Sequence, residues 1–158
     1  MILPITLTIA AAAALLNIWI GWRVGQVRMR SKILIGDGGN AALVGRMRAH
    51  SNYVEYTPFF LILLALIEHG IGSPMWLWAV SILYIIARIL HAFGMDRNKV
   101  NGLRAAGIII TYLVTIGLAG FAIYLAYQSP SMRRPEAAPP GSTLSHPVSA
   151  HPAPAGQS

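Results

Sequence analysis

Four long apolar stretches, separated by shorter polar segments, set the pattern of the chain. Ile2–Trp22 contains no charged residue, and Tyr53–Ile67 contains only Glu55. Met75–Ala87 and Ala105–Gln128 are again uncharged. An α-helix of about 20 apolar residues crosses a hydrocarbon core that is roughly 30 Å thick. The pattern therefore predicts an all-α membrane protein, built as a four-transmembrane-helix bundle.

Three polar segments connect the predicted helices. Arg23–Arg48 is rich in Arg and Lys, Glu68–Pro74 contains glycines and a proline that favour a break, and Asp96–Gly102 is polar throughout most of its length. A secretory signal peptide would place basic residues before the first apolar stretch, and Met1–Asn17 has no Lys or Arg. We therefore expect the first stretch to remain as a membrane helix.

The basic residues of the chain flank its apolar stretches. The 158 residues carry a net charge of +7, yet only 11% are charged, against about a quarter in soluble domains. A nucleic-acid binder needs a basic face on a soluble fold, so that class is excluded. The first and third connections are basic and the second has no Lys or Arg. The positive-inside rule then places those two in the cytoplasm and both termini outside, although Arg133 and Arg134 argue for the reverse.

The C-terminal segment differs in composition from the rest. Residues 129–158 are rich in Pro, Ala, Ser and Gly, which predicts a disordered tail after a membrane domain that covers residues 1–128. His146 and His151 are isolated between prolines, and the chain has no cysteine. The sequence therefore indicates neither a metal site nor a thiolate nucleophile of its own.

Polar residues gather at the cytoplasmic ends of all four predicted helices. Arg48, Asn52 and Glu55 are spaced i, i+4, i+7 and share one stripe of the second helix. Arg88 and His91, at i and i+3, share a stripe of the third. The full set comprises Arg28, Arg48, Asn52, Glu55, Arg88, His91 and Arg104.

This layer combines several cations with one carboxylate. A charge inside a membrane is costly, so Glu55 should face the bundle and pair with a cation or a ligand amine. One interpretation is structural: Glu55 pairs with Arg48 or Arg88 and holds helices together, and the other arginines are membrane-edge anchors. The other is a site for an anionic ligand with one ammonium group, whose carboxylates Arg would bind in bidentate fashion.

Three segments resemble a known family. They are Gly25–Arg30 (GQVRMR) at the end of the first helix, Arg48–Pro58 (RAHSNYVEYTP) at the start of the second, and Arg88–His91 (RILH) at the end of the third. In a four-helix context they resemble the MAPEG family, the membrane-associated proteins in eicosanoid and glutathione metabolism, and especially its small bacterial members. The resemblance covers roughly residues 1–128.

The resemblance implies a homotrimer that binds glutathione between neighbouring subunits near the cytoplasmic face. Glutathione has two carboxylates, one ammonium and one thiol, which fits the ligand inferred from charge. By resemblance, Glu55 would receive the ammonium and Arg88 would support the pocket. The glutathione-binding positions carried over are Arg28, Arg48, Asn52, Glu55, Tyr56, Arg88 and His91.

Arg104 matches the family's thiolate-stabilising arginine. A free thiol has a pKa of about 8.5, and a guanidinium beside it favours the nucleophilic thiolate. The alternative is that Arg104 is a positive-inside anchor. Met95 and Ile108 stand where related enzymes carry tyrosines, and Ser51 stands where some members carry an arginine. These departures favour glutathione binding over the eicosanoid activities.

Two functions remain open at this point. The first is a membrane glutathione transferase, with peroxidase activity as a variant, that acts on hydrophobic electrophiles from the bilayer. The second is a non-catalytic membrane scaffold protein of the same fold that binds glutathione or lipid. A transporter is disfavoured because the polar cluster lies at one membrane face rather than at the midplane. A hydrolase is also disfavoured, because the chain has no GxSxG or HExxH motif. The likeness to bacterial members suggests an inner membrane.

Overall fold

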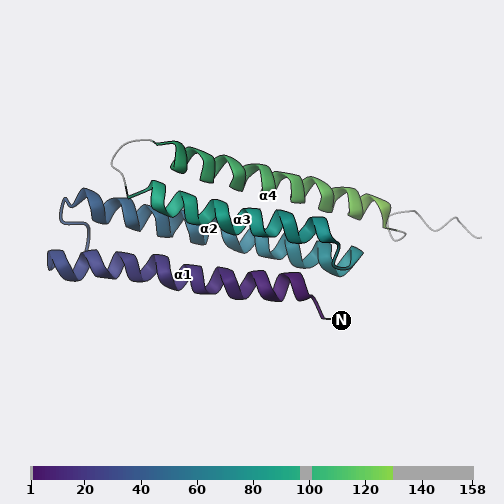
Figure 1. Ribbon diagram of the computed structural model, residues 1–158, viewed down its shortest axis with the longest axis horizontal. Helices are drawn as coiled ribbons and strands as arrows, with labels where there is room; N and C mark the ends of the chain where they lie inside the picture. The colour runs from purple at the N-terminus through teal and green to yellow at the C-terminus, as the bar shows by residue number, and fades with distance from the viewer. Residues whose placement is uncertain (1, 97–100, 130–158) are drawn as a thin grey trace, which may run out of the picture.

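The computed structural model describes residues 2–96 and 101–129. Over these residues the chain forms four α-helices and no strand (Figure 1). The helices are α1 (Pro4–Ser31), α2 (Ala41–Ile71), α3 (Met75–Gly94) and α4 (Gly102–Gln128). Each is long and apolar enough to cross a membrane. The prediction of an all-α four-transmembrane-helix bundle is confirmed, while the predicted tail lies, apart from Ser129, outside the described residues.

The four helices run side by side along the long axis of the molecule (Figure 1). The most extensive packing joins α3 to α4 and α1 to α2. By contrast, α1 and α4 do not touch and lie on opposite sides of the bundle, with α2 and α3 between them. The site residues expected on α2, α3 and α4 therefore come from helices that contact one another.

The first two helices are longer than their apolar stretches. Helix α1 continues past Trp22 to Ser31, and α2 begins at Ala41 instead of Tyr53. The prediction that Arg23–Arg48 is one connection was therefore wrong, since only residues 32–40 join the two helices. Arg, Lys, Gln and Met are good helix formers, so a loss of apolar character marks the membrane boundary without ending the helix.

Local signals set the true helix ends. Lys32 closes α1 in the left-handed conformation, at φ 54°. The side-chain oxygen of Asn40 accepts a hydrogen bond from Leu43 N at the start of α2, and Asn101 does the same for Arg104 N at the start of α4. Helix α2 ends at Ile71 with Gly72 as its cap, so the predicted break, which began at Glu68, started four residues too early.

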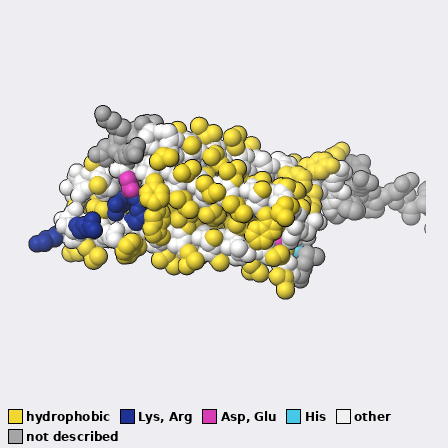
Figure 2. All heavy atoms as spheres, in the orientation of Figure 1, with side chains coloured by type: hydrophobic (Ala, Val, Ile, Leu, Met, Phe, Trp, Pro, Cys, Tyr) yellow, Lys and Arg dark blue, Asp and Glu magenta, His cyan; other side chains and the backbone are white. Residues whose placement is uncertain are grey.

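The apolar core lies between α2, α3 and α4, with the first turns of α1 against it. Phe60 of α2 stacks on Tyr84 of α3, with 3.7 Å between ring centroids. The buried cluster consists of Ile5, Ile9, Phe60, Leu64, Ile67, Leu77, Tyr84, Val114 and Leu118. Apolar side chains also cover the outside of the bundle between its ends (Figure 2), as expected where the solvent is lipid.

Glu68 is a fully buried carboxylate at the end of the bundle where α1 begins. Its two oxygens accept hydrogen bonds from Ile5 N at 2.9 Å, Thr6 N at 2.7 Å, Thr6 Oγ1 at 2.7 Å and Ser73 Oγ at 2.6 Å. The residue that precedes α1, Leu3, has no side chain that can cap the helix. Glu68 therefore caps α1 from a neighbouring helix, where the positive end of the helix dipole favours a carboxylate.

A second, partly buried polar contact fastens α1 towards its other end. The Arg23 guanidinium lies against the rings of Trp19 and Phe93, 4.7 and 5.2 Å from their centroids, and forms an ion pair with Asp96. Arg46 of α2 reaches the same carboxylate, with its Nε 3.3 Å from Asp96 Oδ1, and donates to the carbonyl oxygen of Arg23 at 2.9 Å. Asp96 thus joins α1 and α2 to the residues that follow α3.

Glycines allow α3 and α4 to approach closely beside the polar end. A methyl group added at Gly107 of α4 would lie 2.7 Å from the carbonyl oxygen of Ala87 and 2.7 Å from His91 N. An added methyl at Gly94 of α3 would overlap the backbone of Arg104. The two glycines therefore set the separation between the helix that carries His91 and the helix that carries Arg104.

Replacing Gly107 by Ala is expected to lower the free energy of unfolding by about 1–3 kcal/mol, because the methyl group would overpack a backbone contact. Gly117→Ala is the matched control, since a methyl group there meets nothing within 4 Å. That change should be neutral or stabilise α4 by up to about 1 kcal/mol. Thermal unfolding of both variants in detergent, followed by circular dichroism, measures the difference. Equal melting temperatures would contradict the packing argument.

Candidate functional site

A polar cavity of about 180 Å³ lies where α3 ends, between α2, α3 and α4. Its lining residues are Arg48, Ser51, Asn52, Glu55, His91, Met95 and Arg104. Five of them belong to the set that the sequence singled out. Lys and Arg side chains gather at this end of the molecule, where α1 connects to α2, and the middle is apolar (Figure 2). The structure therefore brings residues of three helices into one polar site.

The face of α2 that lines the cavity is the predicted stripe. Arg48, Asn52 and Glu55 line it together, as their i, i+4, i+7 spacing requires. Glu55 is exposed to the cavity and does not pair with Arg48 or Arg88. Within residues 2–96 and 101–129, the ion pairs are those of Asp96. The structural interpretation, in which Glu55 pairs with an arginine to hold helices together, is therefore wrong for these residues.

Arg88 lies behind the cavity wall and is 1% exposed. It donates to Asn52 Oδ1 at 2.8 Å and to Thr111 Oγ1 at 3.3 Å, and its guanidinium lies 5.5 Å from the ring centre of Tyr53. Its Nε has no hydrogen-bond partner among the described residues. Arg88 thus fixes the orientation of the Asn52 amide. The Nδ2 group of that amide takes no part in this hydrogen bond.

His91 lines the cavity and is 5% exposed. Its Nδ1 is buried and has no hydrogen-bond partner among the described residues. A buried polar atom without a partner costs free energy, so the His91 imidazole is an uncompensated polar group in the wall of the cavity. Arg104, the third residue of α4, also lines the cavity, near the positive end of that helix.

Two predicted residues lie outside the cavity of this chain. The Arg28 guanidinium donates to the carbonyl oxygens of Leu34 at 3.3 Å and Gly36 at 3.0 Å. The hydroxyl of Tyr56 lies 3.0 Å from that of Tyr112, on the outer face between α2 and α4. A single subunit therefore does not bring Arg28 or Tyr56 to the polar site.

The structure also shows where the three residues that depart from the family pattern lie. Met95 is nearly buried and lines the cavity, so its thioether occupies part of the wall. Ser51 lines the cavity as well, whereas Ile108 does not. Sequence reasoning did not find the contacts of Arg23, Asp96 and Glu68, because it assigned all three to connections. For Arg23 and Glu68, the available signal was a charged residue directly after an apolar stretch.

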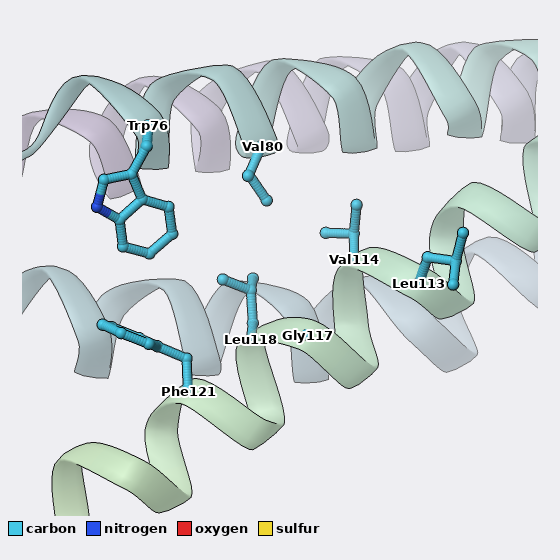
Figure 3. A pocket seen from close by; sticks show the side chains of 7 residues that line it. All are labelled: Trp76, Val80, Leu113, Val114, Gly117, Leu118 and Phe121. Atoms are coloured by element: carbon cyan, nitrogen blue, oxygen red, sulfur yellow. The ribbon is translucent and has the colours of Figure 1, made fainter.

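A larger cavity, of about 500 Å³, lies between α3 and α4 towards their other ends (Figure 3). Trp76 and Val80 face Leu118 and Phe121 across it, and its walls are almost entirely apolar. Val80 precedes His91 by eleven residues, or about 16 Å along α3. This cavity holds no group for acid–base or charge chemistry, so the smaller polar cavity is the candidate site.

Fold and site together define an integral membrane protein of four helices with a polar, charge-lined cavity at one end. The sequence model of the MAPEG family matches residues 6–124, and the chain belongs to the MAPEG family. It is similar to the inner membrane protein YecN from two strains of Escherichia coli. The identity is 30% over 90 residues, which is 56% of this chain and 68% of YecN. The predicted family is confirmed.

Proposed function

We propose that this protein is a membrane-bound, glutathione-dependent transferase that conjugates glutathione to hydrophobic electrophiles. The observation that carries the proposal is the composition of the polar cavity. Two guanidinium groups, an amide, an imidazole and one unpaired carboxylate line a single space. That set complements a zwitterion with an excess of carboxylate, and glutathione has two carboxylates and one ammonium.

Each lining residue binds a different chemical group of the ligand. Glu55 receives the γ-glutamyl ammonium, and Arg48 binds a carboxylate with the geometry that a guanidinium favours. Asn52, held by Arg88 at 2.8 Å, presents an oriented amide to the peptide backbone of the ligand. His91 lines the same cavity and offers its imidazole as a further hydrogen-bonding group.

A homotrimer would complete this site. The family resemblance implies that glutathione binds between subunits, and Arg28 and Tyr56 lie outside the cavity of their own chain. In a trimer, Arg28 of one subunit would bind a glutathione carboxylate held by the next. This arrangement makes the oligomeric state part of the proposal, and cross-linking in a native membrane measures it.

Arg104 supplies the chemistry. Its guanidinium, at the positive end of α4, stabilises the glutathione thiolate, and the thiol proton passes to solvent. The thiolate sulfur then attacks the electrophilic carbon, a C–S bond forms, and the leaving group or the electron pair of the activated bond moves away from that carbon. With a lipid hydroperoxide as substrate, the same thiolate would attack the terminal peroxide oxygen, the O–O bond would break and the lipid alcohol would leave after protonation. A second glutathione would then reduce the sulfenic acid to give oxidised glutathione and water.

The electrophile reaches the site from the bilayer. The protein is proposed to lie in the inner membrane, as the name of YecN says of that relative. Its basic end faces the cytoplasm, where the positive-inside rule places the first and third connections, and both termini face the opposite side. Glutathione would then enter from the cytoplasm.

A second function is favoured by one residue. Met95 lines the cavity where related enzymes carry a tyrosine, so the wall lacks a hydroxyl that could assist the reacting group. A non-catalytic protein that holds glutathione or a lipid would need only the binding residues. Binding without thiolate formation and without turnover distinguishes this scaffold function from the transferase.

Glu55→Gln is expected to weaken glutathione binding by about 10- to 150-fold, because a hydrogen bond to a charged group contributes about 1.5–3 kcal/mol. Calorimetry in detergent measures the affinity, and ultraviolet absorbance of the thiolate is recorded on the same samples. Asp37→Asn is the matched control, since that carboxylate is exposed in the connection between α1 and α2. Unchanged affinity in the Glu55 variant, or no binding by the folded wild-type protein, would overturn the proposed site.

A further inference from the structure

The connection between α1 and α2 exposes apolar side chains beside basic ones. Leu34 is 90% exposed and Ile35 is 93% exposed, next to the exposed Lys32 and Arg30. A cavity of about 410 Å³ lies against this surface, and its lining residues are Arg28, Met29, Lys32, Ile33 and Leu34. Its walls are mainly apolar, with two cations at the edge. None of these residues lines the polar cavity of this chain.

The position of this surface along the membrane normal follows from helix length. Helix α1 has 28 residues and so extends about 42 Å, whereas the hydrocarbon core is about 30 Å thick. Its last turns therefore lie at the level of the lipid headgroups. Arg28 donates to the carbonyl oxygens of Leu34 and Gly36, which folds the connection back beside the end of α1. Leu34 is thus held near the headgroups instead of projecting into water.

The chemistry of the surface fits a lipid with a negative headgroup. Arg28, Arg30 and Lys32 carry three positive charges here, and Asp37, which accepts from Gly39 N, carries the one negative charge of the connection. Basic residues near a membrane are attracted to anionic phospholipids, and apolar side chains between them gain by insertion at the interface. A soluble partner fits less well, because it would have to compete with the adjacent bilayer for contact with Leu34 and Ile35.

We infer that residues 29–35 form a binding surface for anionic phospholipid. Arg30 and Lys32 contact the phosphate and headgroup, and Leu34 and Ile35 insert at the boundary of the hydrocarbon layer. The surface anchors the basic end of α1 in a leaflet that contains acidic lipid. This inference does not depend on the proposed transferase activity.

Single-cysteine labelling tests the surface, because the chain has no cysteine. Leu34→Cys carries an environment-sensitive fluorophore, and the protein is reconstituted in phosphatidylcholine vesicles with or without phosphatidylglycerol. Met75→Cys is the matched control, since Met75 is 81% exposed at the opposite end of the bundle, where the connection has no Lys or Arg. Nitroxide-labelled lipids report the depth of each fluorophore.

At position 34 we expect emission at shorter wavelength and stronger nitroxide quenching when phosphatidylglycerol is present, with no such dependence at position 75. Each cation near an anionic surface contributes about fivefold in affinity, so Arg30→Gln with Lys32→Gln should lower the preference for phosphatidylglycerol about tenfold or more. Both positions are exposed, so the double variant should keep the wild-type melting temperature. Water-like emission at position 34 in both vesicles would overturn the inference. So would self-quenching between labelled chains regardless of lipid, which would instead place this surface against another copy of the protein.

Discussion

Replacing Arg104 by Gln is expected to abolish thiolate formation by bound glutathione at neutral pH and to lower turnover by about 10- to 1,000-fold. A nearby opposite charge lowers the pKa of an acid by about 1–3, and below that pKa each unit changes the thiolate fraction tenfold. The Arg104 backbone N–H donates to Asn101 Oδ1, and this cap does not involve the guanidinium. The fold of α4 should therefore survive the change.

The measurement separates chemistry from binding. Thiolate absorbance and steady-state turnover should fall in Arg104→Gln, while calorimetric affinity for glutathione changes much less than in Glu55→Gln. Arg104→Lys keeps a positive charge and should restore part of the thiolate signal, although it loses the planar guanidinium geometry. If the Gln variant still forms thiolate, Arg104 is an anchor of the basic end and another group must activate the thiol. Wild-type protein that binds glutathione without forming thiolate would support the scaffold function.

Replacing Glu68 by Ala is expected to lower the free energy of unfolding by about 3 kcal/mol or more. The carboxylate accepts four hydrogen bonds, from Ile5 N, Thr6 N, Thr6 Oγ1 and Ser73 Oγ. A hydrogen bond to a charged group contributes about 1.5–3 kcal/mol, and donors left unsatisfied in lipid have no water to replace the lost acceptor. Loss of the cap should also let the first turn of α1 separate from α2.

Thermal unfolding in detergent, followed by circular dichroism, gives the size of this effect. Glu68→Gln keeps one acceptor oxygen and should fall between the wild type and the Ala variant. His69→Ala is the adjacent control, because His69 is exposed. The polar cavity lies at the other end of the bundle, so the folded fraction of the Glu68 variant should bind glutathione with unchanged affinity. A melting temperature equal to that of the control would contradict the capping role.

The number of helices and the composition of the polar site could be predicted from the sequence, for separate physical reasons. An apolar run of about 20 residues has one favourable arrangement in a membrane, so each run predicted a helix. Arg48, Asn52 and Glu55 lie on one stripe because a helix has a fixed period. His91 and Arg104 line the same cavity because α3 and α4 meet at the basic end of the bundle. The alternation of basic connections with one that has no Lys or Arg predicts that they meet there. Their ligand roles stay predictions.

The helix ends and the buried charges could not be predicted in the same way. Hydropathy reports where a chain leaves lipid, whereas α1 ends at Lys32 and α2 begins after Asn40 because of backbone conformation and capping. The burial of Arg23 depends on Trp19, Phe93 and Asp96, which only the packed bundle brings together. Tertiary pairing of this kind leaves no periodic signal along the chain.

The fastening of α1 at both ends has a consequence for biosynthesis. Arg23 leaves the ribosome 73 residues before Asp96, and Ile5 leaves it 63 residues before Glu68. During insertion, α1 therefore crosses the membrane with an arginine that has no acid partner and an N-terminus that has no cap. Helix α2 brings the cap, and the arginine gains its partner only after α3 has been made. The first helix to be synthesised is thus secured at both ends only after the third has been made, and a nascent chain that stalls before Asp96 would expose this arginine to quality control.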